Sequence, residues 1–414
     1  MAAAEDGSWD QTGEMFEDPE EKKVVYCALD SYLQYAKVAH FNVTHLRRQS
    51  FYALPQAQWQ MLAAPPFNFL DTLDRTDEAI DANAQLARAI AHHGIKSFGL
   101  ANPDPAASAS PDEPALAREW VGIAKHSDID KARSTLRQFF RDWTAAGAAE
   151  RQASYSPVFT AVESQRARLA TTSSSSSGND SGANLSVLVP GAGLGRLVFE
   201  LCRAGCDVEG NEISYHQLLA SDFILNHTKT AGQFTIFPWV HTFSNHRTRE
   251  NHLRSYAVPD LHPGTALASV SSLSSPPSQP GTMSMCAADF LCLYGDEARR
   301  ATYDVVATVF FLDTAPNLVR YLETILSCLK PGGILVNVGP LLHDYNNSSG
   351  IADPGSFELA DDEVMALVER VGFVVEARET DRPAPYIQDD ESMMQTLYRA
   401  STWVARKPLA GDGI

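Results

Sequence analysis

The stretch SVLVPGAGLGRL, residues 186–197, is the most informative part of this 414-residue chain. Residues 186–190 read as a short buried strand, which leads directly into Gly191, Gly193 and Gly195 and then into a helical segment. Glycines at such a turn let the backbone approach a ligand closely, at the carboxyl edge of a sheet where α/β proteins bind nucleotides. The turn alone is also what a tight strand–helix connection without any ligand would use.

The sequence on the carboxyl side of this stretch alternates between strand and helix patterns. Strand patterns occur at 206–212, at 234–238, in TYDVVATVFFLDT (302–314) and in GGILVNVGPLL (332–342), with an amphipathic helix at 317–330. A further helix pattern at 357–373 precedes two terminal strands, near 374–380 and 401–407. Alternating units of this kind predict an α/β fold with a mainly parallel, Rossmann-like sheet flanked by helices.

Composition shifts divide the rest of the chain. Residues 1–20 are polar and acidic and are expected to form a disordered tail. Residues 21–170 carry apolar residues at helical spacing and predict a helical N-terminal region, while the Ser-rich stretch 171–184 is expected to be a flexible linker. The Rossmann-like domain then spans 185–408, with a Pro/Ser/Gly-rich insertion at 258–282 interpreted as a flexible surface loop.

The charge balance excludes several classes of partner. Asp and Glu number 51 against 33 Lys and Arg, a formal net charge of -18, which argues against nucleic-acid and anionic-membrane binding because both require basic surface. The N-terminal sequence lacks a signal-peptide pattern, so we expect a cytoplasmic protein, with nuclear residence left open. The 6 cysteines form no CxxC pair and no zinc-finger spacing, and no metal site is expected.

A carboxylate at a defined distance from the glycine turn indicates a nucleoside cofactor. Glu212 ends the second strand pattern, 21 positions after Gly191 (212 − 191), where a carboxylate can accept hydrogen bonds from both ribose hydroxyls. The glycines follow GxGxG, and Arg196 stands where the dinucleotide pattern GxGxxG has its third glycine. Together with the LKPGG turn at 329–333, this favours S-adenosylmethionine over NAD.

Several longer motifs resemble one known family. VLVPGAGLGRL, GNE, PWVHTFSN, FFLDTAPN, LKPGG, NVGPLL and SMM…Y are similar to the carnosine N-methyltransferases, which methylate the imidazole of β-alanyl-histidine to give anserine. The resemblance covers roughly residues 20–407, including STLRQFFRDW and AERQASYSPV ahead of the glycine turn. It implies a class I methyltransferase sheet with an N-terminal helical cap and S-adenosylmethionine as cofactor.

The resemblance also implies which residues hold the cofactor. Arg141 would pair with the methionine carboxylate, because a guanidinium binds a carboxylate bidentately. Asp289 would accept from the exocyclic amine of adenine while Phe290 packs on the ring. The full implied set of cofactor contacts is Gln138, Arg141, Gly191, Gly193, Glu212, Asp289, Phe290 and Val309.

The resemblance assigns substrate recognition to Asp313, His343 and Tyr398, with Asp313 as the catalytic residue. Only the imidazole nitrogen that bears a lone pair can attack a methyl group, so a carboxylate that accepts a hydrogen bond from the N–H of the other nitrogen fixes the reactive tautomer. The family pattern GPLLYH reads GPLLHD here, which places Asp344 at the position of the family's substrate-binding His and His343 one residue earlier. This departure affects acceptor identity more than reaction type.

Two other function classes stay open at this point. One is a methyltransferase for another acceptor, such as a protein histidine, and the other is a non-catalytic partner-binding protein on a methyltransferase fold. The presence of Gly191, Glu212 and Asp313 together argues against the second class, and the glycine spacing makes an NAD oxidoreductase the weakest option. The expected partner is a small histidine dipeptide, without nucleic acid or membrane, and a homodimer is left open.

Overall fold

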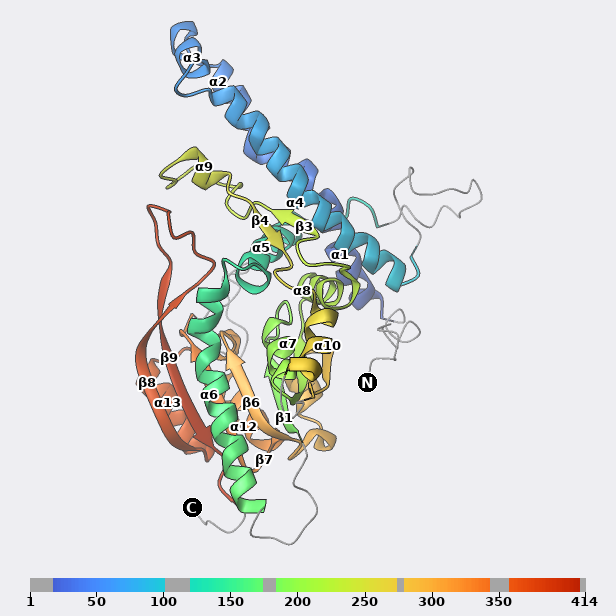
Figure 1. Ribbon diagram of the computed structural model, residues 1–414, viewed down its shortest axis with the longest axis vertical. Helices are drawn as coiled ribbons and strands as arrows, with labels where there is room; N and C mark the ends of the chain where they lie inside the picture. Colours follow the sequence, from blue (N-terminus) through green and yellow to red (C-terminus); the bar gives the residue numbers. More distant parts are fainter. Residues whose placement is uncertain (1–17, 101–119, 174–183, 274–278, 343–356, 410–414) are drawn as a thin grey trace. The chain divides into compact units, whose positions relative to one another are not determined.

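The computed structural model describes residues 18–100, 120–173, 184–273, 279–342 and 357–409 (Figure 1). The described chain forms two compact units. The helical unit takes its residues from 1–148, 215–262 and 387–395, and the sheet unit takes them from 149–214, 263–386 and 396–414. Most of the predicted acidic tail, most of the predicted Ser-rich linker, and His343 lie outside the described residues.

The sheet unit is built on a seven-stranded sheet in the order β5-β2-β1-β6-β7-β9-β8. Strands β5, β2, β1, β6 and β7 are parallel to one another, and β9 is antiparallel to both of its neighbours. This confirms the expected Rossmann-like sheet. The strands are β1 (Leu185–Pro190), β2 (Cys206–Glu212), β5 (Met283–Ala287), β6 (Tyr303–Val309), β7 (Leu329–Gly339), β8 (Val374–Pro385) and β9 (Leu397–Arg406).

Helices cover both faces of this sheet, as the near-continuous apolar strands require (Figure 1). One face packs against α6 (Ala148–Ser173), α7 (Arg196–Arg203) and α10 (Pro263–Leu273). The other face packs against α11 (Phe290–Tyr294), α12 (Leu318–Cys328) and α13 (Asp361–Val371). Successive side chains of β1 alternate between the two faces of the sheet. Leu188 packs in the core under α11, α12 and α13, whereas Val187 and Val189 pack in the core under α6, α7 and α10. Two short 3-10 turns, η4 (Glu297–Arg299) and η5 (Leu312–Thr314), flank β6.

The helical unit is organised around two long helices, α1 and α4, which pack along each other (Figure 1). Their apolar stripes meet in a core that includes Leu29, Ile80, Leu86 and Ile90. The elements are α1 (Pro19–Ala39), η1 (His40–His45), α2 (Leu46–Tyr52), α3 (Gln56–Ala63), α4 (Phe69–Ser97), α5 (His126–Trp143), α8 (Tyr215–Asp222), η3 (Phe223–His227), β3 (Phe234–Ile236), α9 (Arg249–His252) and β4 (Tyr256–Val258).

The structure differs from the sequence expectation in three places. Helix α6 packs on the sheet, although 149–170 reads as part of the helical region, because Val158 and Val162 are buried in the sheet core. The strand pattern at 234–238 forms β3, which pairs with β4 inside the helical unit and not with the main sheet. The insertion 258–282 has the composition of a loop, yet residues Pro263–Leu273 form α10, since the Ala- and Leu-containing run after Pro263 favours a helix.

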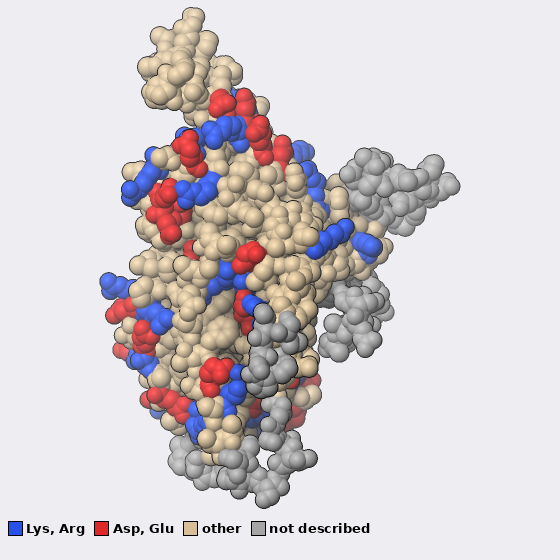
Figure 2. All heavy atoms as spheres, viewed as in Figure 1, with Lys and Arg blue, Asp and Glu red and all other residues tan. Residues whose placement is uncertain are grey.

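The surface carries charges of both signs, except at one end of the helical unit. On the face drawn in Figure 2, Lys and Arg are interspersed with Asp and Glu, while the end that contains α3 is uncharged. No Lys, Arg, Asp or Glu occurs from Gln49 to Leu70, and Tyr52, Met61 and Phe67 are exposed there. None of the described helices has the length and apolar composition of a membrane span.

Candidate functional site

The predicted site residues of the sheet unit gather at one edge of the sheet. Because β5, β2, β1, β6 and β7 are parallel neighbours, their carboxyl ends lie together. Gly191 and Gly193 follow β1, Glu212 ends β2, Asp289 follows β5, and Val309 ends β6. The antiparallel β9 begins at this edge, which adds Tyr398, since Ser401 pairs with Gly339 at the end of β7. These positions thus lie at one edge of the sheet, while their role in cofactor binding stays a prediction.

The glycine turn needs its glycines for two different reasons. Gly191 has φ +65°, and a Cβ there would lie 2.7 Å from Cδ2 of Phe311. Gly193 has φ +57°, but a Cβ there would meet no heavy atom within 4 Å. Both conformations are unfavourable for residues with a side chain. Gly191 is therefore needed to make room for the ring of Phe311, whereas Gly193 lines open space where a ligand can approach the backbone.

Glu212 is fixed in place by backbone donors. Its Oε2 accepts from the N–H of Gly193 at 2.9 Å, and its Oε1 accepts from the N–H groups of Ile213 and Ser214, each at 2.9 Å. Burial raises the pKa of the Glu212 carboxyl, and these three donors oppose that rise by stabilising the charged form. A carboxylate held beside Gly193 suits the paired hydroxyls of a ribose.

Asp289 and Phe290 differ in how accessible they are. Asp289 is exposed and caps α11, with its Oδ1 accepting from the N–H of Cys292 at 3.0 Å. Phe290 is only 3% exposed, and its ring lies 5.4 Å from that of Phe311 and 5.2 Å from that of Tyr321. The ring of Phe290 is thus mainly a core side chain, and the exposed carboxylate of Asp289 is the more accessible of the two groups for a ligand.

The chain leaves β6 through an unusual conformation. Val309 is half-buried, and Phe310 follows with φ +54°, a left-handed conformation that non-glycine residues rarely adopt. The N–H of Phe310 donates to the carbonyl of Val338 at 2.9 Å, which holds this turn against the end of β7. Such strain is typical of functional sites, where the surrounding structure enforces it.

Asp313 lies three residues farther along, in η5. Its side chain is buried, at 7% exposure, and Oδ2 accepts from the N–H of Leu342 at 3.3 Å. Leu342 is the last described residue before His343, so the segment that departs from the family pattern starts directly beyond a residue that contacts Asp313.

Three aromatic rings assemble near Asp313. The ring centroid of Phe310 lies 5.0 Å from that of Tyr386 and 5.8 Å from that of Tyr398, and the two tyrosine rings are 5.9 Å apart. Burial raises the pKa of Tyr398, and the neighbouring Tyr386 and the charge of Asp313 raise it further. Sequence reasoning named Tyr398 but missed Phe310 and Tyr386, because only the pairing of β8 with β9 brings Tyr386 beside Tyr398.

The two remaining predicted cofactor residues belong to the helical unit. Gln138 and Arg141 lie three residues apart on α5. The guanidinium of Arg141 donates to the buried carboxylate of Asp142, from Nε to Oδ1 at 2.7 Å and from Nη2 to Oδ2 at 3.2 Å. The Oε1 of Gln138 accepts from Nε2 of Gln217 at 2.9 Å.

Comparison with known proteins identifies relatives over almost the whole chain. The family model for carnosine N-methyltransferase matches residues 118–409. The carnosine N-methyltransferase of Schizosaccharomyces pombe is 34% identical over 396 residues, which are 94% of this chain and 97% of that protein. The Rattus norvegicus enzyme of the same name is 32% identical over 388 residues, covering 94% of this chain and 87% of that protein.

Two further similarities are more limited in extent or in degree. The Drosophila melanogaster protein named carnosine N-methyltransferase unmet is 38% identical over 280 residues, covering 68% of this chain and 56% of that protein. Among solved structures, an S-adenosylmethionine-dependent methyltransferase from Methanosarcina mazei shares 15% identity with a TM-score of 0.34, covering 55% of this chain and 95% of that chain.

The family match, the strand order of the sheet and the positions of the site residues all indicate a methyltransferase. The strand order carries the glycine turn and the spaced carboxylate of Glu212 to the ligand-binding edge. The chain is therefore an enzyme of the methyltransferase class with S-adenosylmethionine as cofactor, and it belongs to the carnosine N-methyltransferase family.

Proposed function

We propose that this protein methylates an imidazole nitrogen of carnosine and so forms anserine. The observation that carries the proposal is the placement of Asp313, a buried carboxylate beside Tyr398, at the same sheet edge as the glycine turn and Glu212. Relatives of similar length are named for carnosine methylation, which supports the same acceptor here.

The residues at this edge fit S-adenosylmethionine. The open space at Gly193 admits a ligand against the backbone, and the buried carboxylate of Glu212 offers acceptors for ribose hydroxyls. The exposed Asp289 offers an acceptor for the amine of adenine. When bound, this cofactor supplies an electrophilic methyl group on a sulfonium.

Asp313 prepares the acceptor nitrogen. Its carboxylate accepts a hydrogen bond from the N–H of one imidazole nitrogen, which keeps its proton, and this leaves the lone pair of the other nitrogen available for attack. The same negative charge stabilises the imidazolium that forms as the methyl group is transferred. The neighbouring rings of Phe310, Tyr386 and Tyr398 provide an aromatic surface suited to a cationic ring. Holding nucleophile and methyl group in line provides the rest of the acceleration.

The deciding experiment is turnover of labelled S-adenosylmethionine with carnosine, free histidine and a histidine-containing peptide in parallel, with the product identified by mass spectrometry. Preferential methylation of the carnosine imidazole supports the proposal and shows that the His343–Asp344 sequence is tolerated. Methylation of the peptide alone moves the acceptor to a protein histidine. Cofactor binding with no turnover of any acceptor favours a partner-binding protein on this fold.

Two further expectations have direct tests. A homodimer remains a prediction that sedimentation velocity checks, and the uncharged segment 49–70, which contains α3, is the natural place for substitutions if a dimer is observed. A cytoplasmic location also remains a prediction, which imaging of the tagged full-length chain checks.

A further inference from the structure

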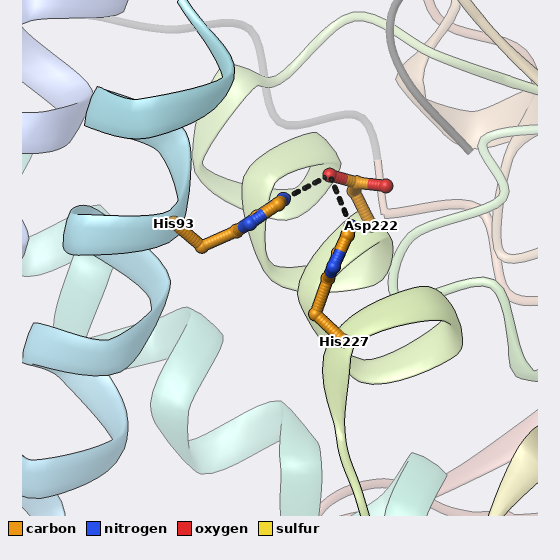
Figure 3. A group of neighbouring side chains, drawn as sticks. All are labelled: His93, Asp222 and His227. Carbon is orange, nitrogen blue, oxygen red and sulfur yellow. Dashed lines mark hydrogen bonds and ion pairs between the residues drawn. The ribbon is translucent and has the colours of Figure 1, made fainter. Parts of the chain in front are cut away.

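Two histidines and one aspartate converge in the helical unit, in a part of the chain that the methylation chemistry does not use (Figure 3). His93 comes from α4, Asp222 ends α8, and His227 ends η3. Both imidazole rings point at the same carboxylate oxygen: the Nε2 atom of His93 lies 2.6 Å from Oδ2 of Asp222, and the Nε2 atom of His227 lies 3.9 Å from it.

The spacing of these donor atoms suits a small divalent cation. Bonds from zinc to imidazole nitrogen and carboxylate oxygen are about 2.0–2.2 Å long, so two donors of a tetrahedral centre lie about 3.4 Å apart. The observed separations of 2.6 and 3.9 Å lie on either side of this value, and all three donors fall within 4.8 Å of one another. Small side-chain rotations therefore bring the three donors to a common ion.

A bound ion would supply the partner that a buried nitrogen of His227 lacks. Its Nε2 atom is buried and has no hydrogen-bond partner, although the ring is partly exposed. The two imidazole rings lie almost on top of each other, with centroids 3.7 Å apart, so two protonated rings would repel strongly. A neutral imidazole is the form that binds a metal.

A supporting contact orients the carboxylate. The second oxygen of Asp222, Oδ1, accepts from Nδ2 of Asn226 at 2.8 Å, which leaves Oδ2 directed at the two rings. Partners of this kind hold metal-binding side chains in position in known sites. The hydroxyl of Ser97 also lies 3.1 Å from Nε2 of His93.

We infer that His93, Asp222 and His227 form a binding site for a divalent transition metal of the zinc type, which ties α4 to the turn after α8. Two imidazoles and one carboxylate are ligands that zinc accepts, with the fourth position left to water. Sequence inspection missed the group because His93 lies 129 residues from Asp222 and no Cys or His spacing motif marks it.

The test measures zinc binding to the metal-free, full-length protein with its affinity tag removed, in a Cys292→Ser background that takes away the exposed thiol. Competition with a chromophoric chelator gives the stoichiometry and affinity. We expect one equivalent to bind and to raise the thermal unfolding midpoint. Cobalt substitution should give the visible spectrum of a tetrahedral site with nitrogen and oxygen ligands.

Matched variants separate this site from adventitious binding. His227→Gln should abolish the stoichiometric binding, and Asn226→Ala should weaken it by about 10- to 100-fold, as outer partners of metal ligands do. His92→Gln, at the adjacent position on α4 and outside the group, should leave the affinity unchanged. Absence of saturable binding by the parent protein, or equal binding by His227→Gln, would overturn the inference and leave a hydrogen-bonded cluster only.

Discussion

At the scale of single residues, two glycines in one turn face different constraints. Gly191 has a left-handed backbone and also packs against Phe311, whereas Gly193 has a left-handed backbone beside open space. The same substitution at the two positions should therefore produce different defects, one in stability and the other in ligand binding.

We expect Gly193→Ala to lower the free energy of unfolding by about 1–2 kcal/mol through backbone strain and to weaken S-adenosylmethionine binding clearly. Gly191→Ala should cost about 1–3 kcal/mol more than that, because its methyl group also collides with Phe311. Urea unfolding and calorimetry with the cofactor measure the two effects. Equal stability of the two variants would contradict the assignment of Gly191 to packing.

Asp313→Asn tests the proposed preparation of the acceptor. The amide lacks the negative charge that stabilises the imidazolium, so kcat should fall by about 10²- to 10⁴-fold, the range typical of acid–base residues. Cofactor affinity measured by calorimetry should stay near that of the parent protein. Asp296→Asn, which removes a charge from an exposed helix cap, is the control and should keep its activity. A fully active Asp313→Asn enzyme would rule out this role.

The family resemblance makes a separate prediction for Arg141. Arg141→Ala should weaken S-adenosylmethionine binding, because it removes a guanidinium suited to the methionine carboxylate. Calorimetry measures the affinity, and circular dichroism checks that the fold is kept. Since Arg141 also pairs with the buried Asp142, Asp142→Asn is the companion variant that separates lost pairing from lost cofactor contact. Unchanged affinity in Arg141→Ala would contradict the assignment.

The residues that sequence analysis could identify are those whose role follows from local position. Gly191 and Glu212 stand at the ends of strands, so their place at the sheet edge follows from the strand pattern alone. Phe310 and Tyr386 could not be found this way, because their meeting depends on a left-handed turn after β6 and on the pairing of β8 with β9. The same limit applies to His227, whose partners are brought together by tertiary packing.

At the scale of elements, prediction was reliable where hydrophobic periodicity and packing agree. As expected, the two apolar runs form the strands β6 and β7, and the amphipathic pattern forms the helix α12. Helix α10 was missed because its Ser-rich composition has the features of a loop, while its partly buried Leu267 packs on the sheet core. Composition alone does not reveal such a contact.

Helix α8 carries a histidine that should make stability depend on pH. The His216 ring is buried near α1, with Nε2 at 3.1 Å from the Ser31 hydroxyl, and Tyr32 donates to the His216 carbonyl at 2.7 Å. Burial lowers the pKa of His216 to about 4. The unfolded chain, with a histidine pKa of about 6.5, binds a proton that the folded protein excludes. The contribution of the neutral, buried His216 ring to the free energy of unfolding should therefore be fully present above about pH 6.5 and should be lost as the pH falls towards 4.

His216→Gln should reduce this dependence by up to about 1.4 kcal/mol per pH unit between these limits. Urea unfolding of the parent and the variant at several pH values gives the slopes. His126→Gln, an exposed position at the start of α5, is the matched control and should keep the parent slope. Parallel pH profiles for the parent and His216→Gln would contradict the assignment.

At the scale of the whole molecule, the chain passes back and forth between its two units. Residues 215–262 lie between strands of the main sheet in the sequence but belong to the helical unit. There, Asn83 donates to the carbonyl of Phe237 at 3.1 Å and accepts from its N–H at 2.7 Å, and the Tyr35 hydroxyl lies 2.8 Å from Nε2 of His241. The predicted division into a helical region at 21–170 and a Rossmann-like domain at 185–408 does not allow for these contacts, because it assigns 215–262 to the sheet domain.

A fragment of residues 149–414 should therefore fold only in part. It keeps every strand of the main sheet but removes the partners of residues 215–262, so buried groups such as Trp239 become exposed. Hydrogen exchange should show strong protection in the sheet and little protection across 234–241, compared with the full chain. Native-like protection of 234–241 in the fragment would contradict this expectation.

The segment 387–395, the last part of the chain that belongs to the helical unit, has a consequence for protein synthesis. The Nδ2 atom of Asn251 donates to both carboxylate oxygens of Asp389, each at 2.9 Å, and Asp389 lies in the short segment between β8 and β9. On the ribosome, α1 and α4 emerge first, yet their unit is complete only when this late segment has been translated. The helical unit therefore cannot finish folding well ahead of the sheet unit, whose last strand β9 follows directly, and the nascent helices are expected to depend on chaperones until nearly the whole chain has been translated.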